Sequence, residues 1–190
     1  GCNNIPGTTA VTAFNYTARR VHAYGCENTM WAETNVLIED SYLHDNLPHD
    51  TPGCPLEPGP NCHTDGVQIP TGNNIIIRNN TIYGGYIDGS HFGNSAITMG
   101  SNNVDITVEN NLLAGGGYTL YCNQGGVATN SLFKNNRFST VFTSTVGGFG
   151  PWIECTDEQN LCGNVIHETS ALLSGNAACP GAPTIVRILR

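Results

Sequence analysis

An imidazole and a carboxyl group lie close together in this sequence, directly ahead of an alternating apolar run. His63 and Asp65 precede the run 66–69, and a second imidazole, His91, precedes the next such run. Asp and His side chains are common proton donors and acceptors in enzymes, and a Tyr hydroxyl such as that of Tyr121 also donates protons. We therefore take these four residues as candidate catalytic groups, with Asp65 as acid or metal ligand and the two His as bases.

The segment ahead of Asp65 is rich in groups that bind metals. It runs from His44 to His63, is rich in Pro, and contains Asp45 and Asp50. Carboxylate oxygens are the ligands that Ca²⁺ prefers, so Asp45 and Asp50 are candidate Ca²⁺ ligands together with Asp65. The spacing of the His residues matches no compact zinc motif. A solvated loop whose Asp and His side chains cap turns is the alternative.

Short alternating runs elsewhere carry aromatic and polar side chains at equivalent positions. Successive side chains of a strand face opposite sides, and one set faces outward here. The outward set contains Trp31, Gln68, Thr98, Tyr121, Trp152 and Glu154. Aromatic faces beside polar groups suit sugar rings, which makes Trp31, Gln68, Trp152 and Glu154 candidate substrate-binding residues. A register slip of one residue would instead send both Trp side chains inward.

The alternating runs belong to a repeat. A β-rich stretch, then Asn or a similar residue, then an apolar residue recurs at 36–43, 75–82, 106–113 and 132–138. The copies follow one another at intervals of about 25 to 40 residues. A shorter alternating run accompanies each copy. From these runs we expect Met30, Val67, Ile97, Leu120 and Ile153 to point inward, with Ala32, Ile69, Met99, Cys122 and Cys155 beside them.

Such short units bury their apolar sides by stacking on one another, which is the principle of a solenoid. The recurrent Asn fits this arrangement, because Asn tolerates the left-handed backbone of a sharp corner and stacked Asn amides hydrogen-bond to one another. The repeat therefore predicts a β-solenoid. A β-sandwich with Asn-rich turns is the alternative.

The units at 75–82, 106–113 and 132–138 resemble the coils of right-handed parallel β-helix proteins of the pectate-lyase-like superfamily. The resemblance extends over roughly residues 8 to 168 and implies an all-β, right-handed parallel β-helix of about six coils. Members of this superfamily include polysaccharide lyases, polygalacturonase-type hydrolases, alginate epimerases, phage tail spikes and surface adhesins. The fold by itself therefore leaves several functions open.

A second resemblance concerns the candidate site. The stretch His63-Thr64-Asp65-Gly66 is similar to the Asn-Thr-Asp-Gly stretch that carries a catalytic Asp in polygalacturonase-type hydrolases, which implies that Asp65 begins an outward-facing strand. The family's Asp-Asp pair in an intermediate coil is absent, so the usual carboxyl pair of an inverting hydrolase is not predicted. A lyase would also need a group that neutralises a substrate carboxylate, and Arg78 or a Ca²⁺ is the candidate.

Composition narrows the class of protein. The chain has 190 residues, a formal net charge of -8 and 8 Cys. The acidic balance argues against binding nucleic acid, and no apolar run is long enough for a membrane span. The even number of Cys predicts disulfides and a secreted or cell-surface location. Cys54 with Cys62 and Cys155 with Cys162 are plausible pairs, although sequence alone leaves the connectivity open.

We expect one domain over residues 1–190, with an inserted loop at 44–63 and a tail strand at 183–190 that covers the last coil. The predicted function is that of an extracellular, carbohydrate-active β-helix protein, a lyase or hydrolase acting on a polysaccharide along an exposed groove. The alternative is a non-catalytic structural or adhesive β-helix that stacks head to tail into filaments.

Overall fold

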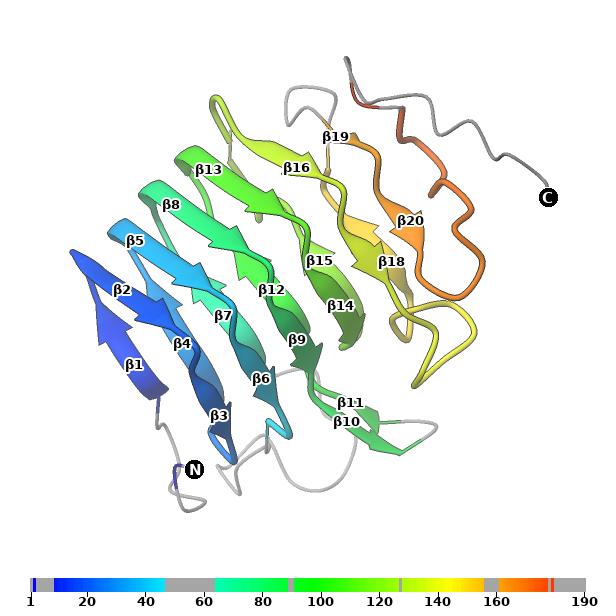
Figure 1. Ribbon diagram of the computed structural model, residues 1–190, viewed down its shortest axis with the longest axis horizontal. Helices are drawn as coiled ribbons and strands as arrows, with labels where there is room; N and C mark the ends of the chain where they lie inside the picture. The colour runs from blue at the N-terminus through cyan, green and yellow to red at the C-terminus, as the bar shows by residue number, and fades with distance from the viewer. Residues whose placement is uncertain are drawn as a thin grey trace, which may run out of the picture.

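The chain winds into a parallel β-helix whose successive coils each add one strand to each of three sheets (Figure 1). The computed structural model describes residue 2 and residues 9–46, 64–88, 91–126, 128–155, 161–177 and 179. Within these residues, each of the three sheets has six strands, and no helix occurs. The predicted all-β, right-handed parallel β-helix of about six coils is therefore confirmed, and the sandwich alternative is wrong.

The three sheets take their strands in chain order. The first sheet contains β1 (Thr9–Ala13), β4 (Asn28–Ala32), β7 (Asp65–Ile69), β12 (Ser95–Met99), β15 (Tyr118–Tyr121) and β18 (Gly150–Ile153). The second contains β2 (Tyr16–Arg19), β5 (Thr34–Glu39), β8 (Asn73–Arg78), β13 (Val104–Glu109), β16 (Leu132–Lys134) and β19 (Leu161–Cys162). The third contains β3 (His22–Tyr24), β6 (Tyr42–His44), β9 (Thr81–Gly84), β14 (Leu112–Gly115), β17 (Arg137–Phe138) and β20 (Val165–Ile166). A small antiparallel pair, β10 (Tyr86–Asp88) and β11 (His91–Phe92), projects beside β9.

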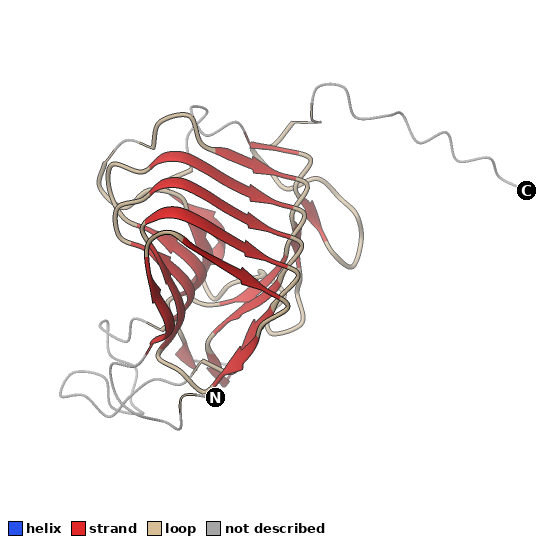
Figure 2. Cartoon of the chain, turned by 60° about the vertical axis from the view of Figure 1, so that its left-hand side comes forward, coloured by secondary structure: helices blue, strands red, loops and turns tan. Residues whose placement is uncertain are grey.

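The three sheets enclose the interior of the helix (Figure 2). The core is built from apolar side chains that stack from coil to coil between these sheets. In the first sheet, Met30, Val67, Ile97 and Leu120 align in register and have no exposed surface. The inward positions predicted for these four residues are therefore confirmed. Burial of stacked apolar side chains gives each coil its stability only through its neighbours, as expected of a solenoid.

The predicted register fails in the last strand of the first sheet. Leu120 aligns with Trp152, and Tyr121 aligns with Ile153, so the orientation predicted for Trp152 and Ile153 is wrong by one residue. The Trp152 ring packs on the core, edge to face with Phe138 at 5.5 Å. The indole of Trp152 occupies the interior at this end of the helix. The alternation of residues in the sequence does not reveal that inward and outward positions of β18 are shifted by one residue.

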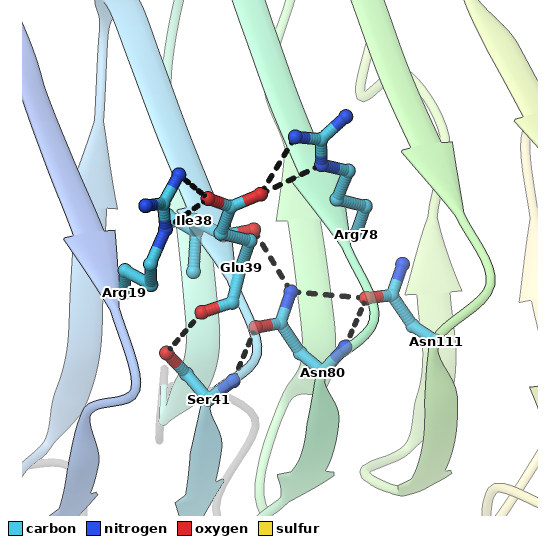
Figure 3. Close-up of polar contacts among 7 residues, drawn as sticks. All are labelled: Arg19, Ile38, Glu39, Ser41, Arg78, Asn80 and Asn111. Atoms are coloured by element: carbon cyan, nitrogen blue, oxygen red, sulfur yellow. Dashed lines mark hydrogen bonds and ion pairs between the residues drawn. The ribbon is translucent and has the colours of Figure 1, made fainter.

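Buried Asn side chains form a ladder along one corner of the helix (Figure 3). The Nδ2 atom of Asn80 donates to Oδ1 of Asn111 and to the carbonyl of Ile38, each at 3.0 Å. Its Oδ1 accepts from the backbone N–H of Ser41 at 2.9 Å. The same contacts recur from Asn111 to Asn136 and from Asn136 to Asn164. The predicted stacking of Asn amides is confirmed.

The left-handed corner belongs to the residue just before each ladder position. Asp40, Asn79, Asn110 and Asn135 have φ between 51° and 57°. Asn and Asp tolerate this backbone better than other side chains, so the two residues of each Asn-Asn pair have different structural roles. The first residue makes the corner, and the second forms the buried amide ladder.

Three disulfides join described residues: Cys2–Cys26, Cys122–Cys155 and Cys162–Cys179. The suggested pair of Cys155 with Cys162 is therefore wrong, because each bonds to a different partner. Cys54 and Cys62 lie outside the described residues.

The C-terminal edge of the helix is partly covered by the segment after β20. Leu172 forms an antiparallel bridge with Val165, and Ala177 forms a parallel bridge with Cys162. Backbone bonds from Ile166 to Ala171 and from Gly163 to Ala177 add to this cover. Residues 183–190, predicted to do this, lie outside the described part of the chain, as do residues 47–63 of the predicted inserted loop. No helix among the described residues has the length and apolar character of a membrane span.

Candidate functional site

A row of four side chains crosses the outer face of the first sheet. Trp31 on β4 aligns with Gln68 on β7, Gln68 with Thr98 on β12, and Thr98 with Tyr121 on β15. Neighbouring strands lie about 4.8 Å apart, so this first-sheet column spans about 14 Å. Thr98 is buried, whereas the other three side chains are partly exposed. The predicted alignment of these four residues in one column is confirmed, whereas Trp152, a member of the same predicted set, packs inward.

Aromatic rings extend the column at its Tyr121 end. The rings of Tyr118 and Tyr121 meet edge to face at 5.6 Å, and Phe149 lies 5.7 Å from Tyr118. Burial raises the pKa of the Tyr121 hydroxyl above its usual value, and the charge of Asp65 raises it further. The hydroxyl therefore stays protonated at neutral pH and acts as a hydrogen-bond donor on this face.

Asp65 begins β7 in a fully buried position. It alternates in phase with the inward residues Val67 and Ile69, so its side chain points inward. Its Oδ1 accepts from the Ser95 hydroxyl at 2.5 Å and from Nδ2 of Asn94 at 2.9 Å. The carboxyl group therefore lies in a polar corner at the start of the strand.

Asn94 connects this corner to the first-sheet column. Its Nδ2 atom donates to Asp65 Oδ1 and, at 3.1 Å, to the Thr98 hydroxyl. Asp65 is also held through its backbone, because its N–H donates to Asn28 Oδ1 at 3.0 Å and its carbonyl accepts from Asn46 Nδ2 at 2.6 Å. The carboxyl position is thus fixed from several sides.

Burial raises the pKa of Asp65 from 3.8 to about 7, against the opposing hydrogen bonds from Ser95 and Asn94. The group is therefore divided between its acid and its carboxylate at neutral pH. A carboxyl group with this pKa is suited to proton transfer near pH 7, as general acid or general base.

Several oxygen atoms on and beside β7 are buried and have no partner. Among the described residues, Oδ2 of Asp65, Oγ1 of Thr64, Oε1 of Gln68 and Oδ1 of Asn46 are buried and have no hydrogen-bond partner. A buried acceptor without a donor is costly, and such groups concentrate at functional sites. These oxygens gather on β7 and the segments beside it, next to the first-sheet column.

The remaining predicted site residues are more scattered. Glu154 is exposed directly after β18, and Trp152 packs inward. Asp45 is exposed and pairs with His44, its Oδ2 lying 2.8 Å from His44 Nδ1. His91 lies in β11, but its side chain, like His63 and Asp50, is outside what the structure describes. The Ca²⁺ site of Asp45 and Asp50 therefore stays a prediction, and no three His, Cys, Asp or Glu side chains converge within the described residues.

Arg78 does not approach the first sheet. It lies on the second sheet and bonds to Glu39, with Nη2 to Oε2 at 2.7 Å (Figure 3). Arg19 contacts the other oxygen of the same carboxylate. Arg78 is therefore part of a structural ion pair on the second sheet and is not placed to neutralise a substrate carboxylate at the first sheet.

Besides the first-sheet column and the residues around Asp65, the structure contains a group of side chains that the sequence analysis did not predict. A cluster of neighbouring rings lies on the outer face of the third sheet, formed by His22 and Tyr24 of β3 and by Tyr42 and His44 of β6. The signal was present, because His and Tyr alternate with apolar residues in both runs. The runs are only three residues long, so their pairing could not be recognised without the coil register.

Comparisons of the chain with protein-family models, with curated proteins and with solved structures found no match. The three parallel six-stranded sheets establish a parallel β-helix, a fold that by itself does not determine an activity.

Proposed function

We propose that this protein is an extracellular β-helix of the pectate-lyase-like superfamily that binds a polysaccharide along the first-sheet column and hydrolyses it. The observation that carries the proposal is the column itself, in which two partly exposed aromatic residues, Trp31 and Tyr121, flank Gln68 and Thr98. Aromatic rings stack on the apolar faces of sugars, while amide and hydroxyl groups bind their hydroxyls. The disulfides support an extracellular location.

The distribution of charge favours a neutral polysaccharide. In the described part of the chain, Arg19, Arg78 and Lys134 lie on the second sheet and Arg137 lies on the third. The described first sheet carries no Arg or Lys. A uronate substrate needs a cation beside its carboxylate, and elimination from it needs that charge neutralised. Hydrolysis of a neutral chain has no such requirement.

Asp65 is the proton donor of the proposed reaction. Its unpartnered Oδ2, with a pKa of about 7, gives its proton to the glycosidic oxygen as the bond to the anomeric carbon breaks. Water adds to that carbon, and its proton passes to a base, for which His63 and His91 are the candidates from the sequence. Gln68 Oε1, which is also buried and without a partner, accepts from a sugar hydroxyl once the substrate has opened this region. Because Asp65 has no exposed surface, substrate binding must open the corner around it.

The alternative is a non-catalytic structural or adhesive β-helix. The complete burial of Asp65 favours it, since a buried carboxyl group also serves to close the corner between coils. The two functions differ in one respect that can be measured: both bind a surface or a polysaccharide, but only one releases new reducing ends.

The disulfide-bonded chain is tested on neutral and acidic polysaccharides, with and without Ca²⁺. New reducing ends and the ultraviolet absorbance of unsaturated products are both followed. We expect reducing ends from a neutral polysaccharide without absorbance, and a loss of at least about 100-fold in Asp65→Asn. Asp105→Asn, at an exposed position of the second sheet, is the control and should keep full activity.

Each other outcome has a defined meaning. Product absorbance would replace hydrolysis by elimination. Full activity in Asp65→Asn would remove Asp65 from the mechanism. If no polysaccharide gives a product, the structural or adhesive alternative is favoured.

A further inference from the structure

Two imidazole rings meet on the outer face of the third sheet, at strands that the proposed polysaccharide site does not use. His22 belongs to β3 and His44 to the adjacent β6. Their Nε2 atoms are 2.7 Å apart. The ring centroids are 4.9 Å apart and the planes differ by 23°, so the two rings lie nearly end to end and each nitrogen points toward the other.

Asp45 determines which nitrogen of His44 carries the hydrogen. Its Oδ2 lies 2.8 Å from His44 Nδ1, and a carboxylate can only accept, so Nδ1–H donates. In neutral His44, Nε2 then presents a free electron pair to His22. A carboxylate behind an imidazole is the usual arrangement behind metal-binding His, because it fixes the tautomer and makes the ring a better ligand.

Neighbouring rings hold both imidazoles in place. The Tyr42 ring stacks on His44 at 3.9 Å and on His22 at 5.5 Å, and the Tyr24 ring lies 5.6 Å from His44. His22 remains exposed, and the His44 side chain keeps 13% of its surface. The two rings are therefore held in place before a ligand binds, and His22 is exposed to solvent, which lowers the cost of binding a ligand at this pair.

We propose that His22 and His44 bind one divalent transition-metal ion, such as Cu²⁺, Ni²⁺ or Zn²⁺. The ion binds between the two Nε2 atoms, and the hydrogen that His22 holds on Nε2 moves through solvent to its Nδ1, so that both rings bind as neutral Nδ1–H imidazoles. With metal–nitrogen bonds of about 2.0 Å, two imidazole nitrogens at adjacent positions of the ion lie roughly 3 Å apart. Because the two nitrogens now point toward each other, both rings also turn so that their electron pairs face the ion. Imidazole ligands suit these metals, and the net charge of -8 favours a cation.

The protein supplies two ligands, and water fills the other positions. No group of three His, Cys, Asp or Glu side chains converges within the described part of the chain, so a site with more protein ligands is not built there. Two-ligand binding is weaker than a structural zinc site and exchanges with solution. The open positions also leave room for a donor group of a second molecule.

The test is a titration of the chelator-treated full chain with Cu²⁺ alone, by calorimetry and by electron paramagnetic resonance. We expect one ion per chain with hyperfine structure from two imidazole nitrogens. His22→Gln and His44→Gln should each weaken this site at least about 10-fold, and Asp45→Asn should weaken it by 10-fold or more. His167→Gln, a change at an exposed His on another strand connection, is the control and should bind as the wild type does.

The proposal is overturned if His22→Gln and His44→Gln both bind Cu²⁺ with unchanged affinity and spectrum. It is also overturned if the wild type binds no Cu²⁺ at a tenfold excess of metal. Circular dichroism on each variant separates a lost site from a lost fold, and both replacements lie at the surface of short strands.

Discussion

Asp65 illustrates how burial changes the chemistry of one residue. The sequence places a carboxyl group ahead of an apolar strand, and that much is correct. The Asp65 side chain lies in phase with Val67 and points inward. Only the structure reveals the resulting raised pKa and the oxygen without a partner within the described residues.

The raised pKa of Asp65 predicts an unusual dependence of stability on pH. The folded carboxyl group takes up its proton near pH 7 and the unfolded one near 3.8. Between these values the folded state binds more protons, so this group makes the protein less stable as pH rises toward 7, and the effect is then constant. Asp65→Asn should remove this dependence on pH. The change in the free energy of unfolding that it removes is a few kcal/mol at most, at about 1.4 kcal/mol per pKa unit.

Chemical denaturation of both proteins at pH 4, 5.5 and 8 measures this contribution. The difference between wild type and Asp65→Asn should shift in favour of the variant as pH increases. A constant difference over the whole range would mean that Asp65 is ionised in the folded protein.

At the scale of strands and corners, two ladders hold neighbouring coils in register. The amide ladder is buried, and it was predicted because Asn recurs at equivalent positions. The ion-pair row of the second sheet was not predicted. Arg19, Glu39, Arg78, Glu109 and Lys134 occupy aligned positions on five successive strands. The alternation of charge becomes visible only when the coils are aligned, since the repeats differ in length.

Asn111→Ala tests the amide ladder. The change removes bonds from Asn111 to the carbonyl of Ile77 and to Asn136, and leaves the backbone N–H of Asn80 without its acceptor. Because these groups are buried, we expect a loss of about 3 kcal/mol in the free energy of unfolding. Asn110→Gly is the matched control, since Asn110 is exposed and has a φ of 57° that Gly adopts freely. A loss in Asn110→Gly as large as in Asn111→Ala would contradict the division of roles.

Glu39→Gln tests the ion-pair row. Hydrogen bonding from Arg78, reinforced by Arg19, lowers the pKa of the Glu39 carboxyl group despite its burial. A lowered folded pKa means that the carboxylate stabilises the protein at neutral pH and that this contribution is lost as pH falls through the folded value. We expect Glu39→Gln to lower the melting temperature at pH 7 and to have less effect at pH 3. An equal effect at both pH values would exclude a charge contribution.

At the scale of the whole molecule, the sequence predicts the solenoid because each coil repeats the same short pattern of apolar and turn residues. It does not predict relations between coils that depend on local exceptions. Trp152 is displaced by one residue, and Cys162 bonds to Cys179 rather than to Cys155. The pairing of His22 with His44 similarly depends on the register of two short strands. Periodicity determines which side a residue faces, but not how irregular coils align.

The C-terminal disulfide should stabilise the last coil locally. Cys162 and Cys179 are separated by 17 residues, and closing a loop of this size contributes about 3 kcal/mol. Replacing both with Ser should accelerate hydrogen exchange in residues 161–177 and leave the first coils unchanged, because solenoid coils depend mainly on their neighbours. The double Ser variant of Cys2 and Cys26, at the other end, is the control and should not affect residues 161–177. Uniformly faster exchange in the Cys162 and Cys179 variant would contradict local stabilisation.

The central claim is that Asp65 donates a proton to a polysaccharide bound along the first-sheet column. The most direct measurement is the pH dependence of reducing-end release by the wild type and by Asp65→Asn. The account predicts a wild-type rate that falls as pH rises through about 7, with the activity and this dependence both lost in Asp65→Asn. A rate that does not change near pH 7, or a profile shared by both proteins, would contradict it.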